Sequence, residues 1–183
     1  MRRSALVASR AGAVALVLSL LVLLGIRIAT AERGAAVAAA VAKGELPAAP
    51  GFDLARIDGR GRVRLASLRG HVVVLNFWAS WCHACVGETS TLESAARRWA
   101  RRGVVFVGVD SQDFASDARA FAHRHGLTYA SVHDGPGAVM NRYGVIGFPE
   151  TWALDRRGRL VDHFVGPVDG RQLNRAIRRA SVE

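Results

Sequence analysis

Apolar and polar residues alternate along the chain in blocks that predict an alternation of strands and helices. Residues 72–78, VVVLNFW, are apolar almost throughout, which is typical of a strand buried on both faces. Between residues 92 and 99 apolar side chains recur at the spacing of an amphipathic helix, which Gly103 would end. Residues 104–109 form a second apolar run. These blocks predict two buried strands joined by a helix.

The remaining blocks continue this pattern to the C-terminus. The predicted elements are strands at 52–54 and 62–65 around a turn at 58–61, a helix at 116–125, a strand at 128–132, a short helix at 138–143, a hairpin of strands at 151–154 and 160–165, and a last helix that opens at 169. This order predicts an α/β fold of three layers, with a central mixed sheet between helices and an N-terminal β-hairpin extension.

The composition of the N-terminal region divides the chain into three expected segments: 1–31, 32–50 and a folded domain at 51–183. A basic start precedes a continuous apolar run at 11–26. Two interpretations stay open: an uncleaved single-pass membrane anchor, which we favour, and a signal peptide cleaved after the small residues 29–31. Both place the domain on the extracytoplasmic side of the membrane. The segment 32–50, rich in Ala, Gly and Pro, is expected to be a linker with some helix in its alanine-rich part.

Charge and cysteine content exclude several classes of function. The net charge is +10, carried almost entirely by scattered arginines, and no nucleic-acid-binding motif accompanies them, so we expect no nucleic-acid partner. The chain has two cysteines, Cys82 and Cys85, which are too few for a disulfide framework. A zinc site would need a second ligand pair, and the six histidines have no suitable spacing. We therefore expect neither a metal nor another cofactor.

The Cys-X-X-Cys pair follows the first apolar strand and stands at the mouth of the predicted helix. Cys82 would lie at the helix N-terminus, where free backbone N–H groups and the helix dipole favour a thiolate. A thiolate at that position can attack a disulfide, and Cys85, one turn further on, can release the product from the mixed disulfide. The sequence therefore predicts a thiol–disulfide oxidoreductase.

The segments 76–82, NFWASWC, and 143–151, YGVIGFPET, together with the order of elements, resemble the thioredoxin fold. More narrowly, residues 51–180 resemble the TlpA/ResA-like, membrane-tethered thioredoxin-like proteins, which include reductases of cytochrome c maturation. The resemblance implies reduction of disulfides in exported proteins, with apocytochrome c as a leading substrate. It also implies a membrane thiol–disulfide donor that recycles the oxidised pair. We expect a monomer.

The resemblance also implies roles for further residues. Glu88 would be a buried proton acceptor near the second sulfur, although an acid in the first helical turn can also simply complement the dipole. Pro149 would be a cis proline that faces the cysteines, with a plain trans turn proline as the alternative. Phe148 and Trp81 would contact substrate beside it, and Glu150 would place an acid near the groove.

Three features of the chain depart from the family or leave a role open. Ala84 stands where the family usually has proline, which affects the reduction potential of the pair. Asn76 occupies the position of the buried acid of thioredoxin, so that Glu88 would take over its role. His83 lies inside the motif, and it either stabilises the thiolate when protonated or is an exposed loop residue.

Two rival functions share these features. A peroxidase of the alkyl hydroperoxide reductase class has the same fold, but it would need threonine three residues before its reactive cysteine, where this chain has Ala79. A copper-binding module could use Cys82, Cys85 and a histidine. Consumption of peroxide at catalytic rates would support the first rival, and tight copper binding without disulfide reductase activity the second.

Overall fold

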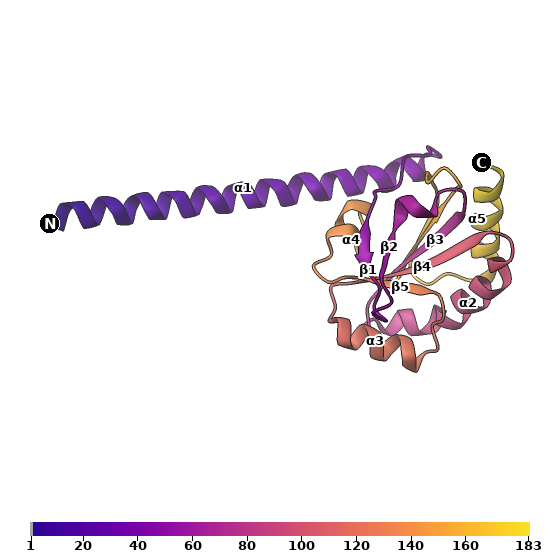
Figure 1. Cartoon of the computed structure of the whole chain (residues 1–183). Coiled ribbons are helices and arrows are strands. Elements are labelled where there is room, and N and C mark those ends of the chain that lie inside the picture. The colour runs from indigo at the N-terminus through magenta and orange to yellow at the C-terminus, as the bar shows by residue number, and fades with distance from the viewer. Residues whose placement is uncertain (1) are drawn as a thin grey trace.

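The computed structural model describes residues 2–183, without the side chains of residues 1–15, 27, 30 and 31. In chain order the elements are α1 (Arg2–Ala42), β1 (Asp53–Ala55), β2 (Arg62–Arg64), a 3₁₀ turn η1 (Leu65–Leu68), β3 (Val72–Trp78), α2 (His83–Ala100), β4 (Val104–Ser111), α3 (Ala115–Arg124), β5 (Ala130–Asp134), α4 (Ala138–Tyr143), β6 (Glu150–Leu154), β7 (Leu160–Val165) and α5 (Gly170–Val182). Figure 1 shows a mixed sheet with helices around it, and α1 extending away from this domain.

The main sheet has five strands in the order β5-β4-β3-β6-β7. β3 pairs with β4, and β4 with β5, in parallel, whereas β6 and β7 are antiparallel to their neighbours. β1 and β2 form a separate antiparallel hairpin ahead of this sheet. The predicted three-layer α/β fold with a mixed sheet and an N-terminal hairpin is therefore confirmed.

Side chains of the central strand β3 alternate between the two faces of the sheet, and every one of them is buried. Val72 and Val74 contribute to a core that is completed by apolar residues of α2 and α5. Val73 and Leu75 contribute to a second core on the opposite face, covered by α4, the hairpin region and the end of α1. The alternation places Asn76 and Trp78 on the α2 face, near the end of β3.

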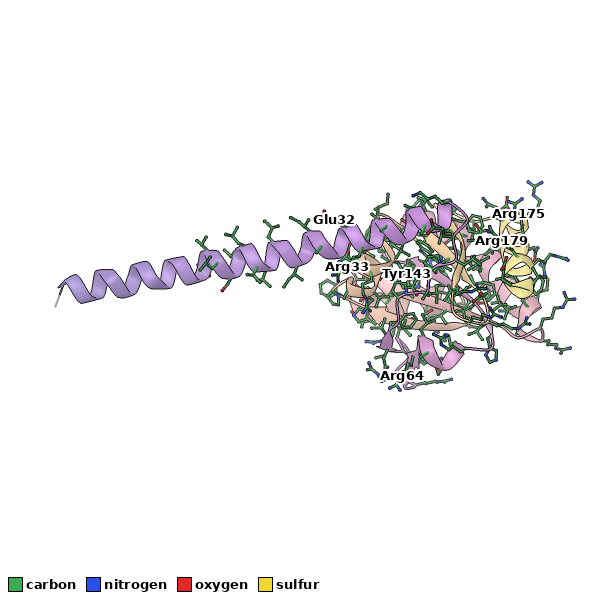
Figure 2. All side chains as sticks on the ribbon, turned by 90° about the horizontal axis from the view of Figure 1, so that it is seen from above. Glu32, Arg33, Arg64, Tyr143, Arg175 and Arg179 are labelled. Carbon is green, nitrogen blue, oxygen red and sulfur yellow. A yellow bond between two sulfur atoms is a disulfide. The ribbon has the colours of Figure 1, made fainter. Side chains whose placement is uncertain are left out.

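The C-terminal helix α5 has the amphipathic pattern that the sequence predicts. A capping box at Asp169 and Gln172 begins the helix. Leu173 and Ile177 are buried against the sheet, while Arg175 and Arg179 point into solvent on the outer side (Figure 2). These arginines are part of a solvated surface.

Helix α1 continues without a break into the segment expected to be a linker and ends at Ala42. Its last turns pack against the domain: Val41 is buried in the core, and the backbones of Gly34 and Gly144 touch. A Cβ atom on Gly34 would overlap the carbonyl oxygen of Asn141. Alanine favours helix in this stretch, and the missing side chain of Gly34 allows the close approach, which the sequence pattern alone did not reveal.

In the described part of the chain, no helix has both the length and the apolar character needed to cross a membrane. The anchor or signal predicted at 1–31 falls largely on residues whose side chains lie outside the described ones, namely 1–15, 27, 30 and 31. The division of the chain into 1–31, 32–50 and 51–183 stays a prediction.

Candidate active site

The two cysteines form a disulfide at the N-terminus of α2. β3 ends at Trp78, and a tight turn in which the Cys82 N–H donates to the Ala79 carbonyl brings the chain to the helix. Cys82 is the N-cap residue, and its sulfur accepts a hydrogen bond of 3.0 Å from the Cys85 N–H. In the reduced protein this donor and the helix dipole stabilise a thiolate on Cys82 rather than on Cys85.

Both sulfur-bearing residues are largely covered in this oxidised state. Cys82 is 6% exposed and Cys85 3% exposed, within a small apolar cluster that includes Trp78, Ala79 and Phe121. Ala79 is itself fully buried. The environment of the pair is therefore apolar on its inner side, which strengthens electrostatic interactions there.

The predicted substrate-binding residues are Trp81, Phe148 and Pro149. The Phe148–Pro149 peptide bond is cis. The Phe148 ring packs against the cysteine cluster and meets the Trp81 ring edge-on, with 5.5 Å between the ring centroids. Trp81 is 62% exposed. The structure thus brings Phe148 against the cysteine cluster and Trp81, which faces solvent, against Phe148, and Pro149 follows Phe148 in the chain.

Glu88 lies nearly one turn beyond Cys85, on the buried side of α2. Its carboxyl accepts hydrogen bonds from Asn76 Nδ2 (2.7 Å) and from the Val168 N–H (3.0 Å). Burial raises the pKa of Glu88 to about 7, and these two donors only partly oppose that effect. A carboxyl with this pKa can both hold and accept a proton near neutral pH.

Asn76 occupies the end of β3 and links Glu88 to the antiparallel strand β6. Its Nδ2 also donates to Thr151 Oγ1 at 3.1 Å. The buried acid, Glu88, therefore belongs to α2, and the strand position where thioredoxin has its acid holds Asn76, which donates a hydrogen bond to Glu88. This arrangement fits the expectation that Glu88 takes over the role of that acid. His83, in contrast, is exposed in the first turn of α2.

Glu150, expected to present an acid near the groove, is fully buried. Its carboxylate accepts a hydrogen bond of 2.9 Å from the Ile146 N–H and lies 2.7 Å from His163 Nε2. Glu150 therefore holds the turn before Pro149 from inside, and that turn presents Ile146, which is 87% exposed, to solvent. The sequence pattern could not show this, because burial of an acid depends on partners from another strand.

A second set of polar contacts, which sequence reasoning missed, supports the cysteine turn from the β4 side. The Ser80 N–H donates to Asp113 Oδ2 at 2.6 Å, and Trp81 Nε1 donates to the Gln112 carbonyl at 3.1 Å. Both acceptors belong to the loop between β4 and α3. Asp113 is a single acid in a loop and belongs to no sequence motif. Its contact with Ser80 could not be predicted, because it depends on the parallel pairing that brings the ends of β3 and β4 together.

Comparison with known proteins agrees with this geometry. The model of the AhpC/TSA family matches residues 47–163. The thiol-disulfide oxidoreductase ResA of Geobacillus thermodenitrificans is 34% identical over 118 residues, which cover 64% of this chain and 67% of that protein. The thioredoxin-like protein YneN of Bacillus subtilis is 31% identical over 131 residues, covering 70% and 76% of the two chains.

Among solved structures, a putative thiol:disulfide interchange protein DsbE from Chlorobium tepidum superposes with a TM-score of 0.70 at 29% identity, covering 74% of this chain and 96% of the other. The matched region contains the Cys82–Cys85 disulfide at a helix N-terminus, the arrangement that thiol–disulfide exchange requires. The chain therefore belongs to the AhpC/TSA family, among its ResA-like thiol–disulfide oxidoreductases.

Proposed function

We propose that this thiol–disulfide oxidoreductase reduces disulfides in exported proteins, with apocytochrome c as a leading substrate. The observation that carries the proposal is the Cys82–Cys85 pair at the N-terminus of α2, with the buried acid Glu88 nearly one turn further on. The resemblance to a thiol-disulfide oxidoreductase ResA and to a putative thiol:disulfide interchange protein DsbE supports exchange between thiols and disulfides as the type of reaction.

In the first step, the Cys82 thiolate attacks one sulfur of the substrate disulfide. A mixed disulfide with Cys82 forms, and the other substrate sulfur leaves as a thiolate. The Cys85 N–H, already directed at Cys82 Sγ, stabilises the attacking charge.

In the second step, Glu88 accepts the proton of the Cys85 thiol. The Cys85 thiolate attacks Cys82 Sγ, closes the intramolecular disulfide, and releases the reduced substrate. Two electrons have then passed from the cysteine pair to the substrate, so the enzyme is left oxidised. A membrane thiol–disulfide donor returns the two electrons in a further exchange.

Substrate would approach as an extended segment over the surface formed by Trp81, Phe148 and Ile146. Exposed aromatic and aliphatic side chains on a soluble domain are typical of a contact surface. The backbone of Phe148, whose side chain packs against the cysteine cluster, would pair with this extended chain.

The same proposal places the domain outside the cytoplasm, attached to the membrane through residues 1–31. Large apolar side chains along α1, from Leu16 to Ile28, are more than half exposed, and a lipid environment would cover them. A cleaved signal peptide is the alternative, and both give an extracytoplasmic domain.

Trapping of the mixed disulfide tests the proposed reaction. In a Cys85→Ala variant, reduced and then mixed with a peptide disulfide of the apocytochrome type (Cys-X-X-Cys-His), the Cys82 adduct should accumulate and appear by mass spectrometry. The matched Cys82→Ala variant should form little adduct. Equal trapping by both variants, or peroxide consumption at catalytic rates by the unaltered protein, would contradict the proposal.

A further inference from the structure

Two hydrogen bonds join the turn that precedes the nucleophile to the loop between β4 and α3. The Ser80 N–H donates to Asp113 Oδ2, and Trp81 Nε1 donates to the Gln112 carbonyl. Within the loop, the Phe114 N–H donates to Asp113 Oδ1 at 2.7 Å. Gln112 has a positive φ of 55°, a conformation that a non-glycine residue keeps only where its surroundings impose it. The position of the turn before Cys82 therefore depends on Asp113.

A second acid, Asp110, lies three residues earlier at the end of β4 and is fully buried. It pairs in register with Trp78 of β3 on one side and with His133 of β5 on the other. Its Oδ2 is 2.6 Å from His133 Nδ1, while its Oδ1 has no hydrogen-bond partner among the described residues. A fully buried carboxyl oxygen without a donor is costly unless the group carries a proton.

The surroundings of Asp110 and Asp113 shift the pKa values of the two carboxyls in opposite directions. Burial, followed by the carboxyls of Asp113 and Asp134, raises the pKa of Asp110 to about 8. Burial also disfavours the charge on Asp113, but the donors from Ser80 and Phe114 outweigh it and hold the pKa of Asp113 below its usual range.

The negative charge of Asp113 disfavours ionisation of Asp110, so Asp110 ionises at a higher pH than Asp113. Asp134 is occupied elsewhere, by the N–H groups of Val139 and Met140 at 2.9 Å each. His133, on β5, is the basic group that faces Asp110.

We propose that Asp113 and Asp110 are positioning residues for the Cys82 nucleophile: Asp113 holds the Ser80–Trp81 turn through its hydrogen bond from the Ser80 N–H, and Asp110, buried at the end of β4, sets the charge beside Asp113. This inference rests on the proposed function, in which Cys82 attacks the substrate. When Asp110 ionises, a second negative charge lies near the Asp113 carboxylate. The turn then loosens, and the reactivity of Cys82 changes in a step that is separate from the titration of Glu88.

The test is the pH profile of Cys82 alkylation by iodoacetamide, measured on the reduced full chain carrying Cys85→Ala. We expect the parent profile to contain a step near pH 8 that Asp110→Asn removes and Glu88→Gln retains. At pH 7, Asp113→Ala should alter the rate constant by roughly ten- to a hundredfold, the size expected from loss of one charge-assisted hydrogen bond. Asp113→Asn, whose amide oxygen can still accept from Ser80, should restore part of the rate.

Asp117→Asn is the matched control, because it removes an exposed acid from the first turn of α3 without touching the pair. A merely structural role would lower the melting temperature and leave the pH profile unchanged. The inference is overturned if the Asp110→Asn profile superimposes on that of the parent, or if Asp113→Ala and Asp117→Asn behave alike. If Asp113→Ala does not fold, the Asp110→Asn profile decides. Mixed-disulfide trapping by Cys85→Ala tests the proposed function separately, so each can fail alone.

Discussion

Single residues set the proton chemistry of the cysteine pair, and Glu88 is the clearest case. It is an acid inside an apolar layer, with donors from Asn76 and Val168 that hold it in place but do not cancel the cost of its charge. The sequence placed this acid next to Cys85, and the family resemblance suggested its role. The pKa, however, depends on burial by distant segments of the chain, which only the folded structure contains.

Removal of the titrating carboxyl in Glu88→Gln should slow release of the mixed disulfide by roughly 10²-fold, because Cys85 loses its proton acceptor. The step near pH 7 in the release rate should also vanish. Stopped-flow measurement of release across pH 5–9 checks both. Glu93→Gln, on the same helix but bound to Thr128 and Arg97, is the control and should leave release unchanged. An unaltered pH profile in Glu88→Gln would reject the role.

Stability should also depend on the proton of Glu88. Its pKa is 4.5 in an exposed setting and about 7 in the fold, so the folded protein keeps a proton that the unfolded chain releases between these values. The contribution of protonated Glu88 to the stability of the folded protein is fully present below about pH 4.5 and is lost as the pH rises through 7. Urea unfolding should therefore show Glu88→Gln gaining stability relative to the parent, by an amount on the order of 2 kcal/mol, between pH 5 and 8. A constant difference across this range would contradict the assignment.

At the scale of elements, the apolar pattern located β3 from Val72 to Trp78 without error, because both faces of that strand are buried. The ends of the strands were harder to predict: β4 continues to Ser111 and β5 to Asp134, each two residues beyond its expected end. Polar residues there pair in register with neighbouring strands, so backbone pairing outweighs the change in side-chain polarity. Contacts such as Ser80 to Asp113 join segments far apart in sequence and could not be predicted.

The contact between α1 and α4 gives a prediction at this scale. Gly34→Ala should destabilise the domain by about 1–3 kcal/mol, because the added methyl group meets the backbone of Asn141 and Gly144. Gly87→Ala, in α2, is the matched control: its methyl group meets no atom within 4 Å, so it should be neutral or stabilising by up to about 1 kcal/mol. Denaturant unfolding compares the two. Equal effects would show that the end of α1 does not pack on α4 in solution.

At the scale of the whole molecule, the long helix α1 leaves the domain and carries exposed leucines and valines away from it (Figure 1). The domain itself supplies the fold and the cysteine site, whereas the proposed cellular location depends on residues 1–31. The apolar run suggested this division, but it did not reveal that the end of α1 packs closely on the domain at Gly34 and Gly144.

Deletion of residues 1–31 should release the protein from membranes without loss of thiol–disulfide exchange. Fractionation of cells expressing each form, followed by reduction of a model disulfide, would check this. If cells that express the full-length gene yield a protein that begins after residue 31, in the soluble extracytoplasmic fraction, the cleaved signal is correct. Recovery of the full chain from the cytoplasm would contradict both forms of the proposal.

The reduction potential of the Cys82–Cys85 pair tests the central claim most directly. Equilibration of the protein with graded glutathione or dithiothreitol buffers, followed by thiol counting, gives the value. A reductase of exported proteins should have a potential near that of thioredoxin, about −270 mV, and no higher than about −220 mV. A value near −120 mV, in the range of the strong oxidant DsbA, would mean that the pair donates disulfides and would contradict the proposed direction of electron flow.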